Sequence, residues 1–250
     1  MIPNRRKRAK RALERQLDYQ ERKAQALPGH EREVIEAMQR SAKRVCDLLS
    51  SFKPMDSRSR VVEVGSGAHG LIFYFDAQRG IGVDPLAVHY ARLFPAWQRQ
   101  ATTVAALGEQ LPFADKSFDI VLCDNVVDHA ESPETIVKEL VRILAPGGLL
   151  YFTVNVHHTI YSAAAKVHAG WQAVGLPFEV GPFADHTTHL TAAAAQELFA
   201  NLPIKVLRER LGIEEARARA RRLPARHLGD RLKRVFYKNA LFEIVAERQP

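Results

Sequence analysis

The sequence predicts an α/β protein with a doubly wound, mostly parallel sheet of seven strands and a helical extension at the N-terminus. Two observations carry this prediction. Short apolar, β-branched runs recur along residues 60–155 and alternate with segments of helical periodicity. Strands that are apolar throughout are typical of parallel sheets covered by helices on both faces. A glycine-rich loop also follows the first of these runs, and Asp84 follows the second.

The individual elements follow from the spacing of apolar residues. Two helices are predicted ahead of the sheet, a highly charged one at residues 5–27 and an amphipathic one at 34–52. The first five strands follow these helices and are predicted at Arg60–Val64, Ile81–Val83, Thr102–Ala105, Ser117–Cys123 and Leu149–Val154. A helix at Pro133–Leu144 precedes the last of these strands and is stopped by Pro146-Gly147-Gly148. The chain closes with a helix at Thr191–Ala200, capped by Thr191, and strands at Ile204–Leu207 and Ala240–Ala246, the last one antiparallel.

The chain divides into an N-terminal helical extension at 1–55 and a main domain at 56–250 with two inserts. The first insert, residues 156–190, contains histidines, prolines and aromatics without a clear period, and we expect it to cover the substrate side. The second insert, residues 208–234, is basic. Residues 1–23 and 208–234 each carry a net charge of +6, so the rest of this +8 chain is mildly acidic. The basic character is therefore local rather than a general field for nucleic acid.

Composition excludes several classes of protein. With 46% hydrophobic residues the chain can bury a core, and no apolar run is long enough for a transmembrane helix. No apolar stretch follows the basic N-terminus, so a secretory signal peptide is not expected. The two cysteines, Cys46 and Cys123, lie far apart and outside any CxxC pattern, so neither a disulfide framework nor a zinc site is expected. These features predict a cytoplasmic protein.

The loop after the first strand is the first candidate binding element. Its glycines, Gly65, Gly67 and Gly70, satisfy the pattern GxGxxG, which allows a tight turn and a close approach of the backbone to a ligand. Asp84, at the tip of the next strand, can accept two hydrogen bonds from a ribose. The pattern predicts a Rossmann-like nucleotide site, and it fits both NAD and S-adenosylmethionine.

The charge of Glu63 favours S-adenosylmethionine over a dinucleotide. Glu63 lies two residues before Gly65, where its carboxylate would repel the pyrophosphate of NAD. S-adenosylmethionine places an ammonium and a sulfonium there instead, which a carboxylate attracts. An NAD oxidoreductase is therefore the less favoured hypothesis.

Several ordered motifs resemble class I S-adenosylmethionine-dependent methyltransferases of the small-molecule, ubiquinone-biosynthesis-like (type 11) group. Beyond the glycine loop, they are Gly108-Glu109-Gln110-Leu111-Pro112-Phe113, Asp115-Lys116-Ser117-Phe118-Asp119-Ile120-Val121 and Leu144-Ala145-Pro146-Gly147-Gly148-Leu149-Leu150. The resemblance covers roughly residues 60–155, with weaker support toward the C-terminus.

The resemblance implies a cofactor site. Gly65, Ser66 and Gly67 would pass under the methionine part of S-adenosylmethionine, and Asp84, with Pro85 beside it, would hold the ribose hydroxyls. Gly108 and Glu109 would lie beside the adenine, and Asp124, Asn125 and Val126 would border the methyl-donor end. Two departures stand out: His69 occupies the usual place of the third glycine, and Leu107 occupies that of a common adenine-binding acid.

Histidines are the candidate groups for chemistry. His129 follows the fourth strand, at the carboxyl edge of the sheet where ligands bind, and could accept a proton from an acceptor hydroxyl. A wall or capping role is the alternative. His157, His186 and His189 are candidates for the substrate side, with a polar loop that caps the next helix as the alternative. No ligand spacing is diagnostic of a metal.

The sequence therefore predicts an S-adenosylmethionine-dependent methyltransferase that methylates oxygen on a small molecule or a glycan-type precursor. Two alternatives stay open: an RNA methyltransferase that uses the basic segments, and a non-catalytic S-adenosylmethionine-binding scaffold. Salt-sensitive binding of the basic segments to an anionic membrane surface or to RNA is a further hypothesis, beside a merely solvated helix.

Overall fold

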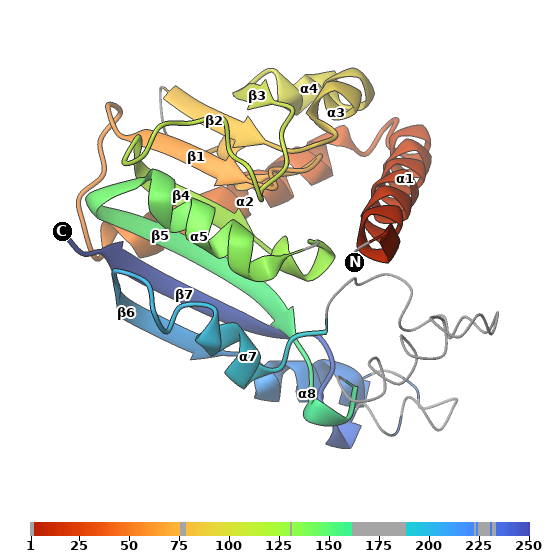
Figure 1. Ribbon diagram of the computed structural model, residues 1–250. Coiled ribbons are helices and arrows are strands. Elements are labelled where there is room, and N and C mark those ends of the chain that lie inside the picture. The colour runs from red at the N-terminus through yellow and green to blue at the C-terminus, as the bar shows by residue number, and fades with distance from the viewer. Residues whose placement is uncertain are drawn as a thin grey trace.

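The computed structural model describes residues 3–75, 79–130, 132–161, 189–222, 224, 231 and 234–250. Its seven-stranded sheet has the order β3-β2-β1-β4-β5-β7-β6 (Figure 1). The strands are β1 (Arg60–Val64), β2 (Arg79–Val83), β3 (Thr102–Val104), β4 (Phe118–Asp124), β5 (Leu144–Val156), β6 (Ile204–Leu211) and β7 (Ala240–Arg248). Neighbours from β3 to β5 pair parallel, whereas β7 is antiparallel to both β5 and β6. The predicted mostly parallel sheet with an antiparallel last strand is confirmed.

Helices cover both faces of the sheet. The described helices and 3-10 turns are α1 (Pro3–Ala26), α2 (Glu31–Ser50), η1 (Leu71–Phe73), α3 (Ala87–Leu93), α4 (Pro95–Gln98), η2 (Val127–His129), α5 (Pro133–Ile143), α7 (Ala192–Glu197) and α8 (Ile213–Arg222). Apolar side chains of α2, η1, α3 and α4 pack in one core, and those of α5, α7 and α8 pack in the other. Successive side chains of a strand point to opposite faces, so Val61 joins the first core and Val62 the second. This is why the strands are apolar at nearly every position.

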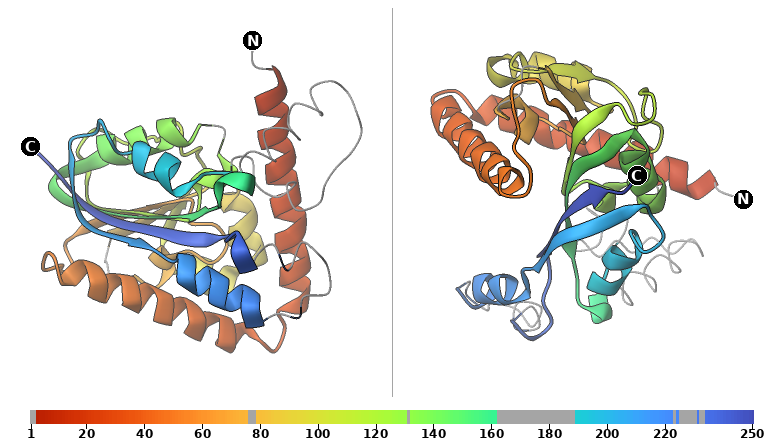
Figure 2. Two further views of the ribbon diagram at one scale, coloured as in Figure 1. Left: turned by 90° about the horizontal axis from the view of Figure 1, so that it is seen from below. Right: turned by 90° about the vertical axis from the view of Figure 1, so that its left-hand side faces the viewer.

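The helix α1 lies across the edge of the sheet at which the parallel strands end (Figures 1 and 2). Its partly buried Leu13, Leu17 and Ala24 pack against the α2-side core. Gln16 hydrogen-bonds to Tyr90 of α3, and Gln20 is buried. The thin apolar side that the sequence predicts is therefore what seats this charged helix on the domain.

The second helix, α2, is a layer of the main domain rather than a separate extension. Its Met38, Val45 and Leu49 are buried in the same core as the sheet residues. Arg44 also reaches across to the sheet, donating hydrogen bonds to Glu243 on β7 (3.0 Å) and to Tyr151 on β5 (2.8 Å).

Two strands extend further than their sequence patterns indicate. β5 begins at Leu144, and the Pro146-Gly147-Gly148 stretch, predicted to separate helix from strand, lies within it. The register shifts there, because Phe118 pairs with Leu144 whereas Ile120 pairs with Leu149. A bulge with Gly147 at positive φ (69°) absorbs the additional residues.

The strand β6 runs to Leu211, so the first four residues of the predicted basic insert are strand. Arg208, Glu209 and Arg210 pair with β7, although their charges hide any strand pattern. α8 follows, and residues 223, 225–230, 232 and 233 lie outside the described part. So do residues 162–188 of the predicted insert 156–190, His186 included.

The helix predicted at Thr191–Ala200 is present as α7 and is shorter. Thr191 is its N-cap, as expected, and its hydroxyl accepts a hydrogen bond from the Ala194 amide (3.1 Å). Among the described residues, no helix combines the length and the apolar character needed to cross a membrane.

Candidate active site

The loop that follows β1 crosses over the end of β2. The amides of Gly65 and Ser66 both donate to the Val83 carbonyl oxygen, at 2.7 and 3.1 Å. Gly65 and Gly67 adopt positive φ values of 76° and 53°, which favour glycine. A Cβ on Gly65 would lie 2.3 Å from a methyl carbon of Val126, whereas one on Gly67 would meet only the Gly65 carbonyl oxygen, at an ordinary van der Waals distance of 3.9 Å. The loop is thus packed tightly against the end of β4 at Gly65 and is uncrowded at Gly67.

Asp84 connects this loop to the start of α3. One carboxylate oxygen accepts a hydrogen bond from the Gly67 amide (3.0 Å), and the other accepts one from the Leu86 amide (2.8 Å). The side chain is buried, and burial raises the pKa of Asp84. Asp84 therefore shapes the loop as well as offering its remaining lone pairs to a ligand.

The outer part of the loop is fixed by aromatic and amide side chains of α4. Trp97 donates from its indole nitrogen to the Ala68 carbonyl oxygen, and Gln98 donates to the carbonyl oxygens of Gly67 and Ala68. The ring of His69 packs at 5.1 Å from Phe94 and 5.2 Å from Trp97. Burial lowers the pKa of His69 to about 4, so its ring is neutral at physiological pH. His69 is thus accommodated by packing outward against α4.

Gly70 is required by its neighbours within the protein. A Cβ at this position would lie 2.4 Å from both a Glu63 carboxylate oxygen and the Ser66 carbonyl oxygen. Its φ is −63°, so close contact rather than unusual backbone geometry explains the glycine. The GxGxxG spacing is met in the sequence, but its third glycine makes room for Glu63.

Glu63 lies beneath the loop, not on its open side. The residue is 1% exposed, and its carboxylate accepts a hydrogen bond from the Ile72 amide of η1 (2.8 Å). Burial raises the pKa of Glu63 to about 8, and the nearby charges of Asp124 and Asp84 add to the rise. The sequence argument that an ionised Glu63 faces the ligand directly is therefore wrong, because the strand directs this side chain into the α2-side core.

The raised pKa has a testable consequence for stability. Between the unfolded value near 4.5 and the folded value of about 8, the folded protein binds more protons at Glu63 than the unfolded chain does. The free energy of unfolding should therefore fall as pH rises through this window, by at most about 1.4 kcal/mol per pH unit from this group. Glu63→Gln keeps an acceptor for the Ile72 amide and should remove that slope. Denaturant titrations of both proteins at pH 5.5 and pH 8 test this, and parallel profiles would contradict it.

The carboxyl end of β4 faces Gly65 through Val126. Asp124 is exposed, and the Thr153 hydroxyl donates to it. Asn125 has a positive φ of 58°, and its side-chain oxygen accepts hydrogen bonds from the backbone amide (3.1 Å) and side-chain amide (2.6 Å) of Asn155. Thr153 and Asn155 thus orient the β4 end. Sequence reasoning did not assign them a role, and the available signal is polar residues at the end of an apolar strand.

The segment around Gly108 connects β3 to β4 in the sequence. A Cβ on Gly108 would lie 3.0 Å from the Ile136 side chain of α5 and 3.3 Å from that of Val64 on β1. Leu107 is 54% exposed and Glu109 is half-buried. Gly108 is therefore pressed against the end of β1, which places this segment beside the glycine loop.

The candidate histidines have different surroundings. His129, in η2, has a side chain 45% exposed, and its Nε2 lies 3.8 Å from the buried carboxylate of Asp128. His157 is completely buried, and its Nδ1 accepts from the Asn239 amide (3.4 Å). Its ring centroid lies 5.0 Å from that of His189, and its amide donates to the Leu190 carbonyl oxygen. His157 and His189 therefore join three chain segments at the end of β5. Of the candidate histidines that the structure describes, His129 is the exposed one, near the end of β4.

The residues of this site fit a cationic nucleoside cofactor. Asp84 and Asp124 border the loop with carboxyl groups, which favour an ammonium or sulfonium over a pyrophosphate, whereas the buried Glu63, with its raised pKa, contributes no exposed charge. The uncrowded backbone at Gly67 leaves room for the ligand backbone, and Asp84 keeps acceptor capacity for a ribose. Pro85, half-buried, follows Asp84 at the start of the next turn.

Comparisons with known proteins find similarity to methyltransferases. Residues 62–152 match the family model described as a methyltransferase domain. A methyltransferase of Mycobacterium sp. (strain JLS), named as uncharacterized, is 35% identical over 121 residues, which are 46% of this chain and 47% of that protein. The ubiquinone biosynthesis O-methyltransferase of Pseudomonas fluorescens (strain SBW25) is 30% identical over 147 residues, covering 48% of this chain and 62% of the relative. The chain spans about half the length of the first curated relatives that it matches.

Solved structures show the same fold. The N-methyltransferase NodS from Bradyrhizobium japonicum WM9, in complex with S-adenosyl-L-homocysteine, superposes with a TM-score of 0.53 at 14% identity, over 87% of this chain and 88% of that one. The strand order of this chain and the family match at residues 62–152 agree with each other. Residues 62–152 of this chain are similar to a methyltransferase domain, and the sheet that contains them has the fold of solved methyltransferases.

Proposed function

We propose that the protein transfers a methyl group from S-adenosylmethionine to an oxygen atom of a small molecule. The observation that carries this proposal is the β4 end, where Val126 packs against Gly65 of the glycine loop and the nearby Asp124 and His129 are exposed. Two relatives that match part of the chain are named as O-methyltransferases, one for ubiquinone biosynthesis and one for malonyl-[acyl-carrier protein]. These names support oxygen as the acceptor atom.

Each part of the site has a proposed role. Gly65, Ser66 and Gly67 pass under the methionine part, Asp84 with Pro85 holds the ribose, and Gly108 and Glu109 border the adenine. Asp124, Asn125 and Val126 border the methyl group. The bound cofactor supplies a methyl group activated by a sulfonium. The chain itself supplies alignment of donor and acceptor, which accounts for much of the acceleration in such displacements.

His129 is the proposed acceptor of the proton that an acceptor hydroxyl must lose. Its exposed ring follows the β4 end, and its Nε2 lies 3.8 Å from the buried Asp128 carboxylate, whose charge would stabilise the protonated ring. Glu63 is proposed to support the glycine loop from below, through its hydrogen bond with the Ile72 amide. His157 and His189 are proposed to shape the substrate side from the end of β5. The role of His186 on that side stays a sequence prediction.

His129→Ala should lower kcat by about 10²–10⁴-fold while leaving the affinity for S-adenosylhomocysteine nearly unchanged. The measurement is transfer of a labelled methyl group to the acceptor found in a screen of sugars, quinones, phenols and RNA. His30→Ala is the matched control, because His30 is also exposed but precedes α2. Equal kcat values for the His129 and His30 variants would remove His129 from the mechanism.

The contacts of the basic segment favour a small molecule over RNA as the acceptor. Arg210 and Arg217 pair with Glu215 and Glu214 at 2.7 Å, and Arg219 donates to the Asn239 carbonyl oxygen. These arginines are engaged by the protein itself, which lessens their availability to phosphates. A labelled-methyl screen in which only RNA accepts the group would reverse this preference.

A further inference from the structure

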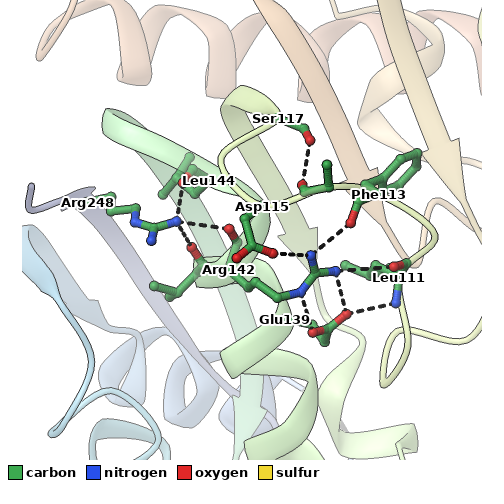
Figure 3. Close-up of polar contacts among 10 residues, drawn as sticks. Leu111, Phe113, Asp115, Ser117, Glu139, Arg142, Leu144 and Arg248 are labelled. Atoms are coloured by element: carbon green, nitrogen blue, oxygen red, sulfur yellow. Dashed lines mark hydrogen bonds and ion pairs between the residues drawn. The ribbon is translucent and has the colours of Figure 1, made fainter.

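One face of α5 runs alongside the segment that follows β3. Ile136, Glu139 and Arg142 are three residues apart, so they lie along one side of the helix. Ile136 contacts the position where Gly108 would carry a Cβ. Glu139 and Arg142 face the residues that come next in the segment (Figure 3). The helix therefore meets the segment 108–115 at successive points in the same order.

The peptide groups of Leu111 are held on both sides. Its amide donates to a Glu139 carboxylate oxygen (2.9 Å), and its carbonyl oxygen accepts from Arg142 (3.2 Å). Glu139 and Arg142 are themselves joined by two hydrogen bonds, of 2.6 and 2.9 Å (Figure 3). Because the Leu111 side chain is also buried, this residue anchors the segment by backbone and side chain together.

Arg142 also binds the part of the segment that lies closer to β4. Its second terminal nitrogen donates to the Phe113 carbonyl oxygen (2.8 Å) and to the Asp115 carboxylate (2.7 Å). The Lys116 amide donates to the Arg142 carbonyl oxygen (2.9 Å). The hydrogen bond from Arg142 is the main cause of the lowered pKa of Glu139, so the pair is ionised at neutral pH. One guanidinium thus bridges α5 to three residues of a segment that has no regular structure of its own.

We propose that Glu139 and Arg142 are positioning residues for the adenine side of the cofactor site. They would hold Gly108 and Glu109 in their binding geometry before the cofactor arrives. A segment already ordered in the free protein loses less conformational entropy on binding, so the affinity is higher. The inference rests on the proposed function, which places the adenine beside Gly108 and Glu109.

The planar fork of arginine suits this task because several donors diverge from one rigid group. Arg142→Gln should weaken binding of S-adenosylhomocysteine by roughly tenfold, the effect of one well-ordered contact. Arg142→Lys should recover only part of the loss, since one ammonium cannot reach Leu111, Phe113 and Asp115 together. Adenosine should show the same proportional loss as S-adenosylhomocysteine, because the effect lies on the adenine side.

Arg248 provides a matched control for folding. It donates to the carbonyl oxygens of Val141, Arg142 and Leu144, so it holds the same end of α5 from β7 (Figure 3). Arg248→Gln should lower the unfolding temperature as Arg142→Gln does, yet leave both affinities within about twofold of wild type. Calorimetric titrations of the folded variants with S-adenosylhomocysteine and adenosine make the comparison.

Three results would overturn the proposal: unchanged affinity in Arg142→Gln, an equal loss in Arg248→Gln, or a loss seen with S-adenosylhomocysteine but not with adenosine. Gly108→Ala and Glu109→Ala separate this failure from failure of the proposed site. If neither substitution alters affinity, the adenine lies elsewhere. If they weaken binding and Arg142→Gln does not, the site stands and only the positioning role is lost.

Discussion

Asp84→Ala should reduce the affinity for S-adenosylhomocysteine by roughly a hundredfold or more. The variant loses the acceptor for a ribose hydroxyl and also the acceptors for the Gly67 and Leu86 amides that shape the loop. Hydrogen bonds to charged groups contribute about 1.5–3 kcal/mol each, and each 1.4 kcal/mol is a factor of ten in affinity. The affinity of Asp84→Asn should lie between those of the wild type and Asp84→Ala, because the asparagine amide keeps only one acceptor oxygen.

Calorimetry with S-adenosylhomocysteine measures this effect, and Asp119→Ala is its control. Asp119 likewise holds a backbone amide, that of Arg60 (2.9 Å), and pairs with the Arg60 guanidinium at the opposite end of the sheet. Its removal should cost stability without a change in cofactor affinity. Wild-type affinity in a folded Asp84→Ala protein would show that the ribose is held elsewhere.

Gly65→Ala should be the most destabilising substitution in the loop. The new Cβ would lie 2.3 Å from a Val126 methyl carbon, and the residue would keep a φ of 76°. The left-handed backbone costs about 1–2 kcal/mol and overpacking about 1–3 kcal/mol, so unfolding should become easier by about 2–5 kcal/mol. Cofactor affinity should fall as well, because the loop must shift to relieve the contact.

Two further variants separate these causes. Gly29 has a similar φ of 87° with nothing near its Cβ position, so Gly29→Ala should show the backbone cost alone. Val126→Ala should restore part of the stability of Gly65→Ala, because it removes the two methyl carbons in conflict. Denaturant unfolding of the four proteins in the Gly65–Val126 cycle measures this coupling. Strict additivity in that cycle would contradict the close packing of Gly65 on the β4 end.

The sheet was predictable because its strands are short, apolar runs bounded by turn residues. Val61 and Val62 are buried in opposite cores. Both faces of the strand are therefore apolar, and this continuous pattern indicates a parallel strand that is covered on both sides. β6 was less visible because an edge strand tolerates charges such as Arg208 and Arg210, which resemble a surface segment. The start of β5 was hidden for another reason, since a bulge accepts the proline and glycines that usually end an element.

The loop geometry of the candidate site was predictable where a local motif fixes the chain, as at Gly65, Gly67 and Asp84. Side-chain direction could not be read in the same way. Glu63 follows apolar neighbours on β1, and only the three-dimensional packing shows that its carboxylate lies under the loop against η1. Likewise, Trp97 and Gln98 hold the glycine loop from a helix about thirty residues later, and no local pattern relates distant segments of this kind.

Titration of the purified wild-type protein with S-adenosylmethionine in a calorimeter tests the central claim most directly. The carboxyl groups of Asp84 and Asp124 beside the glycine loop and the uncrowded backbone at Gly67 predict one site of micromolar affinity, and S-adenosylhomocysteine should compete for it. No heat and no shift in unfolding temperature at millimolar cofactor would contradict the account.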